Sequence, residues 1–390
     1  MLRVAYLSSY SPRQCGIATF TEDLIKNIDN LHIIEPSRIV AINEPGAHYH
    51  YGKEVVWPIE EDDLKTYEQA AEFINCSDID LVNIQHEFGL FGGVWGNYLL
   101  TLLKKLKKPI VTTMHTTLSS SAKALQSPES AKAYNKVVRG IAKVSSDITV
   151  MTNMAARILN ENHGVKMDKI TVIPHGSPDF PINSKDPVKK TLGLEGRTVL
   201  STFGLLSSDK GIQHAISALP EVVQEHPDVL YLIIGVTHPQ VRMHEGEKYR
   251  KSLKRLVDKL GLRDNVRFYN RFLSKPELIQ YLQATDVYIC PYIQEEQLSS
   301  GTVTYALVAG KPIVSTPFHY AKELLADGRG ILCKFHNPKS ITSGVRELLD
   351  NPEKKTSIEK LAYEHGQTMT WPRVASTYVD LFKKIVQSTG

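Results

Sequence analysis

Five segments of this 390-residue chain hold residues whose types and spacing could do chemistry. Each follows a short run of apolar residues, where a strand would end and a loop would begin. They carry, in chain order, Arg13 with Gly16, His86 with Glu87, His115, Gly204 with Lys210, and residues 299–302. Cations and the backbone N–H groups of helix starts bind anions, while His and Glu side chains form hydrogen bonds with hydroxyls. These types suit the binding of phosphate groups and carbohydrates.

Two of the segments are candidate anion sites before a helix. Arg13 and Gly16 precede a helical pattern, although an ordinary strand-to-helix loop with a glycine at its turn would look the same. In FGLLSSDKG, Gly204 permits close approach to the backbone, and Lys210 is a compact charge able to meet a phosphate. The GxxxxGK[ST] pattern of a P-loop is absent, so the segment predicts anion binding without naming the ligand.

The strongest candidate for a phosphate site is the run Ser299, Ser300, Gly301 and Thr302. It stands at the start of a helical pattern, where three hydroxyls and unpaired N–H groups would meet. Helix capping explains one of the serines but not the whole group. Glu295 and Gln297, just before the run, add further hydrogen-bonding side chains.

Two segments in the first half of the chain are candidates for sugar binding. His86 and Glu87 introduce the glycine- and phenylalanine-rich loop FGLFGG, a mixture that often holds carbohydrates. The alternative is a mobile loop whose phenylalanines complete the core. His115 ends the apolar run PIVTTMH and would lie at the carboxyl end of a strand, although a lone histidine there is more often structural.

The elements that must position these residues alternate between strands and helices. The predicted strands are residues 3–9, 38–42, 80–85, 109–115, 147–150, 170–173, 198–203, 229–234, 266–269, 286–290, 312–315 and 330–333. Such alternation is typical of parallel sheets covered on both faces, and we expect two Rossmann-like domains. Ligands bind such sheets at the loops that follow the strands, so the site is expected in a cleft between the domains.

A stretch rich in Pro and Gly, residues 174–196, interrupts this alternation and indicates a hinge. We therefore expect an N-terminal domain over 1–180, a linker over 181–196 and a C-terminal domain over 197–367. A final helix should occupy the segment 368–390. The acidic run Glu60–Asp63 is expected to be the solvated first turn of a helix.

Composition excludes several classes of protein. A net charge of +4 does not mark a nucleic-acid binder, so no nucleic-acid partner is expected. No apolar run approaches the roughly 18 residues of a membrane-spanning helix, and no secretory signal is evident. The 4 cysteines show neither metal-ligand spacing nor a disulfide pattern. We expect a cytoplasmic protein without a bound metal.

Six segments, taken in order, resemble the retaining glycosyltransferases of the GT-B fold, in particular glycosyltransferase family 4 (glycosyl transferases group 1). They are PRQCGIATF, VTTMHTT, VIPHGSPDF, FGLLSSDKG, the stretch from GLRDNVRFYNRF to DVYICPY, and ALVAGKPIVST. The resemblance covers nearly the whole chain. It implies a GT-B architecture: two Rossmann-like domains that face a central cleft, with a C-terminal helix crossing back to the N-terminal domain. It also implies front-face, metal-independent sugar transfer.

The chain departs from the family pattern at three positions. Leu205 stands where the family usually has Arg after the glycine of its phosphate loop. Gln297 and Tyr305 align with a pair of family Glu residues that contact the donor sugar and the nucleotide ribose. A hydroxyl cannot replace both acceptors of a carboxylate, although Glu295 could supply a charge in a shifted register. The chain resembles a subgroup with similar HEFG and SSGT segments, so these changes can be a subgroup trait.

The resemblance implies roles for the candidate residues. Lys210 and residues 299–302, with Gly16 and Gly204, would bind the donor phosphates, and Arg271 and Tyr305 would lie on the nucleotide side. His115, Lys210, Glu295 and Gln297 would serve catalysis, and Arg13, His86 and Glu87 would face the acceptor. The expected donor is a nucleotide sugar, with GDP-mannose as the specific expectation, and no cofactor is needed.

Alternatives remain open. The acceptor would be a saccharide, free or lipid-linked. A disaccharide phosphorylase would use the same phosphate site, and the loss of Glu at Tyr305 suits it. A degenerate, non-catalytic scaffold would explain Leu205, Gln297 and Tyr305 together. The stretch Leu99–Lys108 could contact the inner face of a membrane weakly, or form an ordinary core helix that ends in cations.

Overall fold

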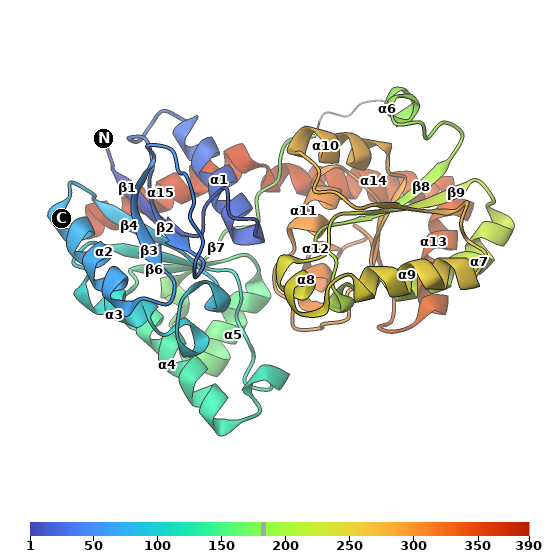
Figure 1. Cartoon of the computed structure of the whole chain (residues 1–390). Helices are drawn as coiled ribbons and strands as arrows, with labels where there is room; N and C mark the ends of the chain where they lie inside the picture. The colour runs from blue at the N-terminus through green and yellow to red at the C-terminus, as the bar shows by residue number, and fades with distance from the viewer. Residues whose placement is uncertain (181–184, 390) are drawn as a thin grey trace. The chain divides into compact units, whose positions relative to one another are not determined.

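The computed structural model describes residues 1–180 and 185–389, whose contacts group into two compact units (Figure 1). Unit 1 comprises Met1–Gly176 together with the segment that begins at Trp371, and unit 2 comprises Ser177–Thr370. Each unit has one parallel sheet covered by helices, which confirms the expected pair of Rossmann-like domains.

The sheet of unit 1 has seven strands in the order β3-β2-β1-β4-β5-β6-β7. They are β1 (Val4–Ser8), β2 (Arg38–Asn43), β3 (Val55–Glu60), β4 (Leu81–His86), β5 (Ile110–Met114), β6 (Asp147–Val150) and β7 (Ile170–Val172). Every residue of β1, β4, β5 and β6 is buried, as expected of central strands with helices on both faces. All pairs of neighbouring strands are parallel, so the loops after the strands gather at one edge.

In its described part, unit 1 has six α-helices. They are α1 (Gly16–Asp29), α2 (Leu64–Cys76), α3 (Leu99–Lys105), α4 (Pro128–Val144), α5 (Asn153–His163) and α15 (Trp371–Thr389). Local sequence sets their ends: Ser127 caps α4 directly before Pro128, and Gly164 ends α5 in the left-handed conformation at φ 70°.

The C-terminal helix α15 crosses back to unit 1, as expected. In Figure 1 its red ribbon runs beside the blue helix α1, and Tyr378 and Phe382 on it are fully buried. A Cβ atom on Gly176 would lie 2.1 Å from Trp371, so only glycine lets the chain pass this ring. The helix is therefore an integral part of the first core.

The sheet of unit 2 has six strands in the order β10-β9-β8-β11-β12-β13, again parallel. They are β8 (Thr198–Phe203), β9 (Val229–Ile234), β10 (Val266–Tyr269), β11 (Val287–Cys290), β12 (Ile313–Ser315) and β13 (Ile331–Leu332). The helices are α6 (Lys185–Thr191), α7 (Ile212–Glu225), α8 (Pro239–Glu245), α9 (Lys248–Lys259), α10 (Lys275–Ala284), α11 (Gly301–Val308), α12 (His319–Leu324), α13 (Pro338–Asp350) and α14 (Pro352–Gly366).

Three local features differ from the expectation. Strand β3 was not predicted because Pro58 lies within it, which an exposed edge strand tolerates. The run Glu60–Asp63 is not a first helical turn: Glu60 ends β3 and Asp63 is the N-cap of α2. The expected linker 181–196 contains α6, and its residues 181–184 lie outside the described part. The contacts of the chain group Ser177, whose backbone N–H donates to the Met369 carbonyl, with unit 2.

The stretch Leu99–Lys108 forms α3 and the loop after it, with Leu99, Leu102 and Leu103 buried against the core. No helix among the described residues is long and apolar enough to span a membrane.

Candidate active site

In unit 2, the loops after β8 and β11 meet at the start of helix α11. Gly204 follows β8 with φ 128°, and a Cβ atom there would lie 3.2 Å from the Thr302 methyl group. Behind it, a Cβ atom on Gly235 would lie 1.9 Å from the Gly204 carbonyl oxygen. Two backbone segments thus pass in contact beside α11, which requires glycine at both positions.

Lys210 lies within this group of loops. Its Nζ is 4.0 Å from the centre of the Tyr292 ring and 3.4 Å from Asp209 Oδ2. Burial alone would lower the pKa of Lys210, but Tyr292, Asp209 and Cys290 outweigh it and raise the pKa above its ordinary value. The side chain keeps 22% of its surface exposed, so a protonated amine is available to an anion.

The start of α11 is joined to Lys210 through Tyr292. The Tyr292 hydroxyl lies 3.0 Å from Thr302 Oγ1, which lies 3.1 Å from Ser300 Oγ. Ser300 is the N-cap of α11, and its hydroxyl accepts from the Val303 N–H. One cation, several hydroxyls and a helix N-terminus therefore meet in one cluster, which we call the Lys210 cluster: Gly204, Lys210, Tyr292, Ser300 and Thr302.

The remaining candidates of unit 2 lie around this cluster. Gln297 donates from Nε2 to the Ser299 carbonyl at 2.8 Å, so it braces the residue before the cap. Tyr305, on α11, lies against Phe203, with ring centres 6.3 Å apart. Glu295 is exposed and binds Lys322 at 2.8 Å, which lowers the pKa of its carboxyl.

Arg271 follows the edge strand β10, two strands away from β8. Its guanidinium binds Glu277 at 2.8 Å. No contact joins Arg271 to the Lys210 cluster among the interactions of the described residues. Leu205, where the family usually has Arg, is half-buried directly after Gly204.

In unit 1, His115 stands directly after β5 and is 6% exposed. Its Nε2 lies 2.8 Å from Gln85 Oε1, and the Phe20 ring packs against the imidazole in a T-shaped pair with 4.7 Å between centres. Burial, with the nearby His175 and His86, lowers the pKa of His115 to about 3. The imidazole is therefore neutral at physiological pH.

His86 and Glu87, at the end of β4, differ in their surroundings. His86 is fully buried between Phe88 and Phe91, and burial lowers its pKa to about 3. Glu87 accepts from Thr116 Oγ1 at 2.6 Å and from the Phe88 N–H at 3.0 Å. Burial raises the pKa of Glu87 despite these two hydrogen bonds. Glu87 is thus a carboxyl group held beside Thr116, the residue that follows His115.

Arg13 and Gly16 lie at the carboxyl end of β1. Gly16 is the first residue of α1 and is exposed. Arg13 Nη1 donates to the Ile42 carbonyl, and the guanidinium lies 3.7 Å from Glu44 and 3.5 Å from Glu61. Two carboxylates therefore already share the charge of Arg13, which makes it a weaker anion receptor than Lys210.

Sequence reasoning missed two important residues, Tyr292 and Gln85. Tyr292 comes two residues after β11, so the rule that drew attention to strand ends could have found it. Gln85 lies inside a strand, and only the pairing of β4 with β5 brings it next to His115.

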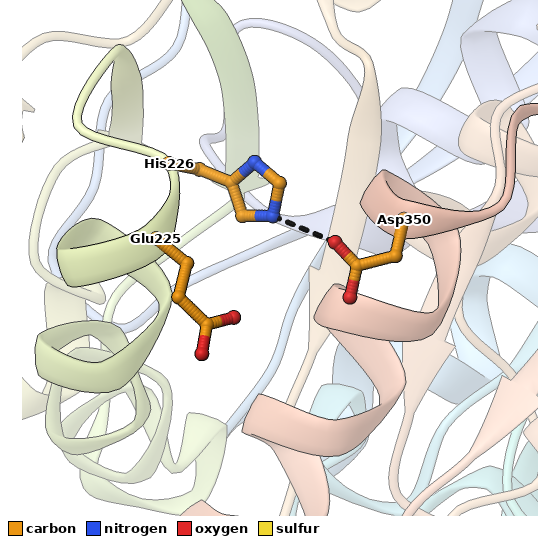
Figure 2. A group of neighbouring side chains, drawn as sticks. All are labelled: Glu225, His226 and Asp350. Carbon is orange, nitrogen blue, oxygen red and sulfur yellow. Dashed lines mark hydrogen bonds and ion pairs between the residues drawn. The ribbon is translucent and has the colours of Figure 1, made fainter.

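A separate group of side chains could hold a metal ion. Glu225, His226 and Asp350 each place one ligand atom within 4.8 Å of the others, the only such group among the described residues. Figure 2 shows the His226 ring facing Asp350, at 2.9 Å, with Glu225 beside them. Arg346 binds Glu225 at 2.7 Å, so the group already links the ends of α7 and α13 without a metal.

Two family models match: Glycosyltransferase Family 4 over residues 16–178 and Glycosyl transferases group 1 over residues 184–365. Spore coat protein SA of Bacillus subtilis (strain 168) is 28% identical over 207 residues, and the match spans only 52% of each chain. D-inositol 3-phosphate glycosyltransferase of Paenarthrobacter aurescens (strain TC1) is 24% identical over 329 residues, 79% of this chain and 76% of that one.

Solved structures share the whole architecture. Anabaena HepE in complex with UDP and glucose gives a TM-score of 0.76 at 16% identity, covering 98% of this chain and 100% of that chain. At this identity the likeness establishes the fold, which the sequence had predicted.

Proposed function

We propose that this chain, which has the GT-B fold, is a glycosyltransferase that transfers a hexosyl group from a nucleotide-diphosphate sugar to a saccharide hydroxyl, with retention at the anomeric carbon. The observation that carries the proposal is the Lys210 cluster. A protonated amine and a hydroxyl-lined helix start provide what a departing diphosphate requires.

In the proposed reaction, the bond from the anomeric carbon to the diphosphate oxygen breaks while the acceptor oxygen bonds to the same carbon from the same face. The acceptor proton passes to the departing phosphate oxygen. Lys210 and the N–H groups at the start of α11 would stabilise the negative charge that develops on this oxygen. This stabilisation does not require a metal ion.

Roles for the other residues follow from their places. His115 would bind a hydroxyl of the donor sugar, and Glu87, with its raised pKa, would bind an acceptor hydroxyl beside Thr116. Arg13 and His86 would shape the acceptor side, and Gly16 would help to bind the donor phosphates. Gln297 would act through Ser299, which it braces, and Glu295 through its charge. Tyr305 and Arg271 are proposed for the nucleotide side.

The proposed donor is GDP-mannose, which rests on the resemblance to a subgroup. HepE binds UDP and glucose, so UDP-glucose is the main competing donor to test. Two other functions compete: the change at Tyr305 favours a disaccharide phosphorylase, and Leu205, Gln297 and Tyr305 together favour a non-catalytic scaffold. Each predicts a different response to ligands.

We propose weak membrane contact, with a lipid-linked acceptor, as a further part of this function. A cavity of about 930 Å³ in unit 1 is lined by Leu100, Leu103, Lys104, Lys107 and Lys143, among others. Apolar and basic groups together suit an anionic lipid surface. Co-sedimentation with anionic vesicles at low salt, absent with zwitterionic vesicles, is the expected result, and no binding to either would rule the contact out.

The deciding experiment is thermal unfolding of the purified protein with GDP, UDP, ADP, their sugars and inorganic phosphate. A ligand at 100 times its Kd adds about 2.7 kcal/mol to the free energy of unfolding. We expect one nucleotide and its sugar to raise the unfolding temperature. Stabilisation by phosphate plus a sugar, without a nucleotide effect, would indicate the phosphorylase, and no effect from any ligand would favour the scaffold.

The variant Lys210→Ala tests the cluster itself. Loss of a charged hydrogen-bonding group should weaken nucleotide binding roughly 10- to 100-fold. Lys251→Ala, exposed on α9, removes the same charge from unit 2 and serves as the control. Equal loss in both variants would mean that Lys210 acts only through net charge.

A further inference from the structure

A continuous chain of buried polar side chains leads from His115 to the C-terminal helix. His115 Nε2 lies 2.8 Å from Gln85 Oε1, and Gln85 Nε2 donates to Asn83 Oδ1 at 2.5 Å. Both amides also approach Thr113 Oγ1 at 3.4 Å, and the Tyr378 hydroxyl of α15 lies 3.1 Å from the same oxygen. Asn83, Gln85 and Thr113 are 0% exposed.

The alternation of strand residues places this chain on one face of the sheet. Residues 83 and 85 of β4 point to the same side of the sheet as residue 113 of β5 and residue 115 directly after it. Helix α15 covers this side. Buried polar side chains in a sheet centre cost stability unless every group is satisfied. An apolar face would pack as well against α15, so this chain of hydrogen bonds calls for a reason beyond stability.

The direction of the hydrogen bonds is fixed by a backbone carbonyl. Asn83 Nδ2 lies 3.1 Å from the Val111 carbonyl oxygen, which can only accept. The other end of the Asn83 amide is therefore its oxygen, and it must accept from Gln85 Nε2. Gln85 then presents its own oxygen to His115. A flip of either amide would place two donors or two acceptors against each other.

His115 Nε2 must therefore be the donor, facing an oxygen that can only accept. Because the buried ring is neutral, it holds one proton, and that proton lies on Nε2. The second nitrogen, Nδ1, is then an acceptor. An acceptor nitrogen suits a sugar hydroxyl, which can donate, and repels a phosphate or carbonyl oxygen, which cannot.

We propose that Gln85 and Asn83 are positioning residues that hold His115 as the neutral Nε2–H tautomer, so that Nδ1 accepts a hydrogen bond from a sugar hydroxyl. Tyr378 anchors the pair through Thr113, which gives the C-terminal helix a part in the site. The inference deepens the proposed function and rests on it only for the identity of the hydroxyl.

The test is ¹⁵N NMR of the histidine ring nitrogens in the full chain, with the His115 signals identified from a His115→Asn sample. We expect a protonated Nε2 and an unprotonated, pyridine-type Nδ1 throughout the neutral pH range. Gln85→Leu should allow both tautomers, whereas Gln85→Glu should retain the Nε2–H tautomer and raise the His115 pKa. Thr112→Val is the matched control, since it removes a buried hydrogen bond to Ser145 from the same strand without touching His115.

Activity provides the second readout. Gln85→Leu should lower kcat/KM for the preferred nucleotide sugar about tenfold, the effect of one hydrogen bond, and Gln85→Glu should recover part of it with a shifted pH profile. If Gln85→Leu does not fold, Asn83→Leu, which frees the Gln85 amide to flip, replaces it.

The outcomes separate this inference from the proposed function. A wild-type ring protonated on Nδ1, or a tautomer unchanged in Gln85→Leu, would overturn the positioning role even in an active enzyme. The expected tautomer in a protein that binds no nucleotide sugar would instead overturn the proposed function and the sugar-hydroxyl contact, leaving Gln85 and Asn83 as the groups that set the ring.

Discussion

Both ring nitrogens of His86 are fully buried, and neither has a hydrogen-bond partner in the described structure. Burial lowers its pKa to about 3, far below the ordinary value of about 6.5. The unfolded chain therefore binds a proton that the folded chain does not, once the pH falls below about 6.5. Folding stability contributed by this site is lost as the pH falls from about 6.5 toward 3.

His86→Leu should remove this pH dependence. Relative to the wild type, the variant should gain about 2 kcal/mol in the free energy of unfolding between pH 6.5 and pH 5. Urea unfolding at the two pH values measures the difference, with His244→Leu, exposed on α8, as the control. If the gain is the same in both variants, His86 titrates normally. The proposed acceptor role further predicts a loss of activity in His86→Leu.

Helix α11 shows how one element can serve both folding and binding. Ser300 caps it through the Val303 N–H, a role that Asp fulfils as well as Ser. A phosphate site, by contrast, would reject an added carboxylate. A change from Ser to Asp should therefore weaken ligand binding without lowering stability.

Ser300→Asp should leave the unfolding temperature nearly unchanged and weaken nucleotide binding at least tenfold. Ser300→Ala should cost about 1 kcal/mol of stability through the lost cap and affect binding less. Calorimetric titration with the nucleotide that stabilises the wild type measures binding by both variants, and thermal unfolding measures their stability. Unimpaired binding by Ser300→Asp would mean that no phosphate reaches this helix start.

At the scale of elements, the sequence predicted the strands that leave a regular apolar pattern. It missed the edge strand and the contacts that depend on strand pairing. Continuous apolar runs identified both parallel sheets, because strands buried on two faces leave that pattern. Strand β3 was missed since its Pro58 and half-buried residues belong to an edge. The loops of the Lys210 cluster were found from their places after strands. The contacts of Gln85 were not, since register between strands cannot be read from one strand's sequence.

At the scale of the molecule, unit 1 is assembled from two distant parts of the chain and unit 2 from one. The sequence predicted a final helix, but only a family resemblance predicted its return to the first domain, since its apolar positions do not say which core they cover. Trp371, Tyr378 and Phe382 are almost fully buried in unit 1, while unit 2 has its own core around Leu219, Tyr231 and Ile289. The two cores should therefore differ in their dependence on the C-terminus.

A chain that ends at Thr370 should lose the cooperative unfolding of unit 1 and keep that of unit 2. Differential scanning calorimetry of the intact chain should first assign the two transitions with Phe382→Ala and Leu219→Ala. Phe382→Ala should cost about 3–5 kcal/mol in unit 1, and Leu219→Ala about 2–5 kcal/mol in unit 2. The truncated chain should then show only the transition moved by Leu219→Ala, still raised by the nucleotide that binds the Lys210 cluster. Loss of both transitions together would instead show that unit 2 needs a folded unit 1, because each core would then unfold with the other.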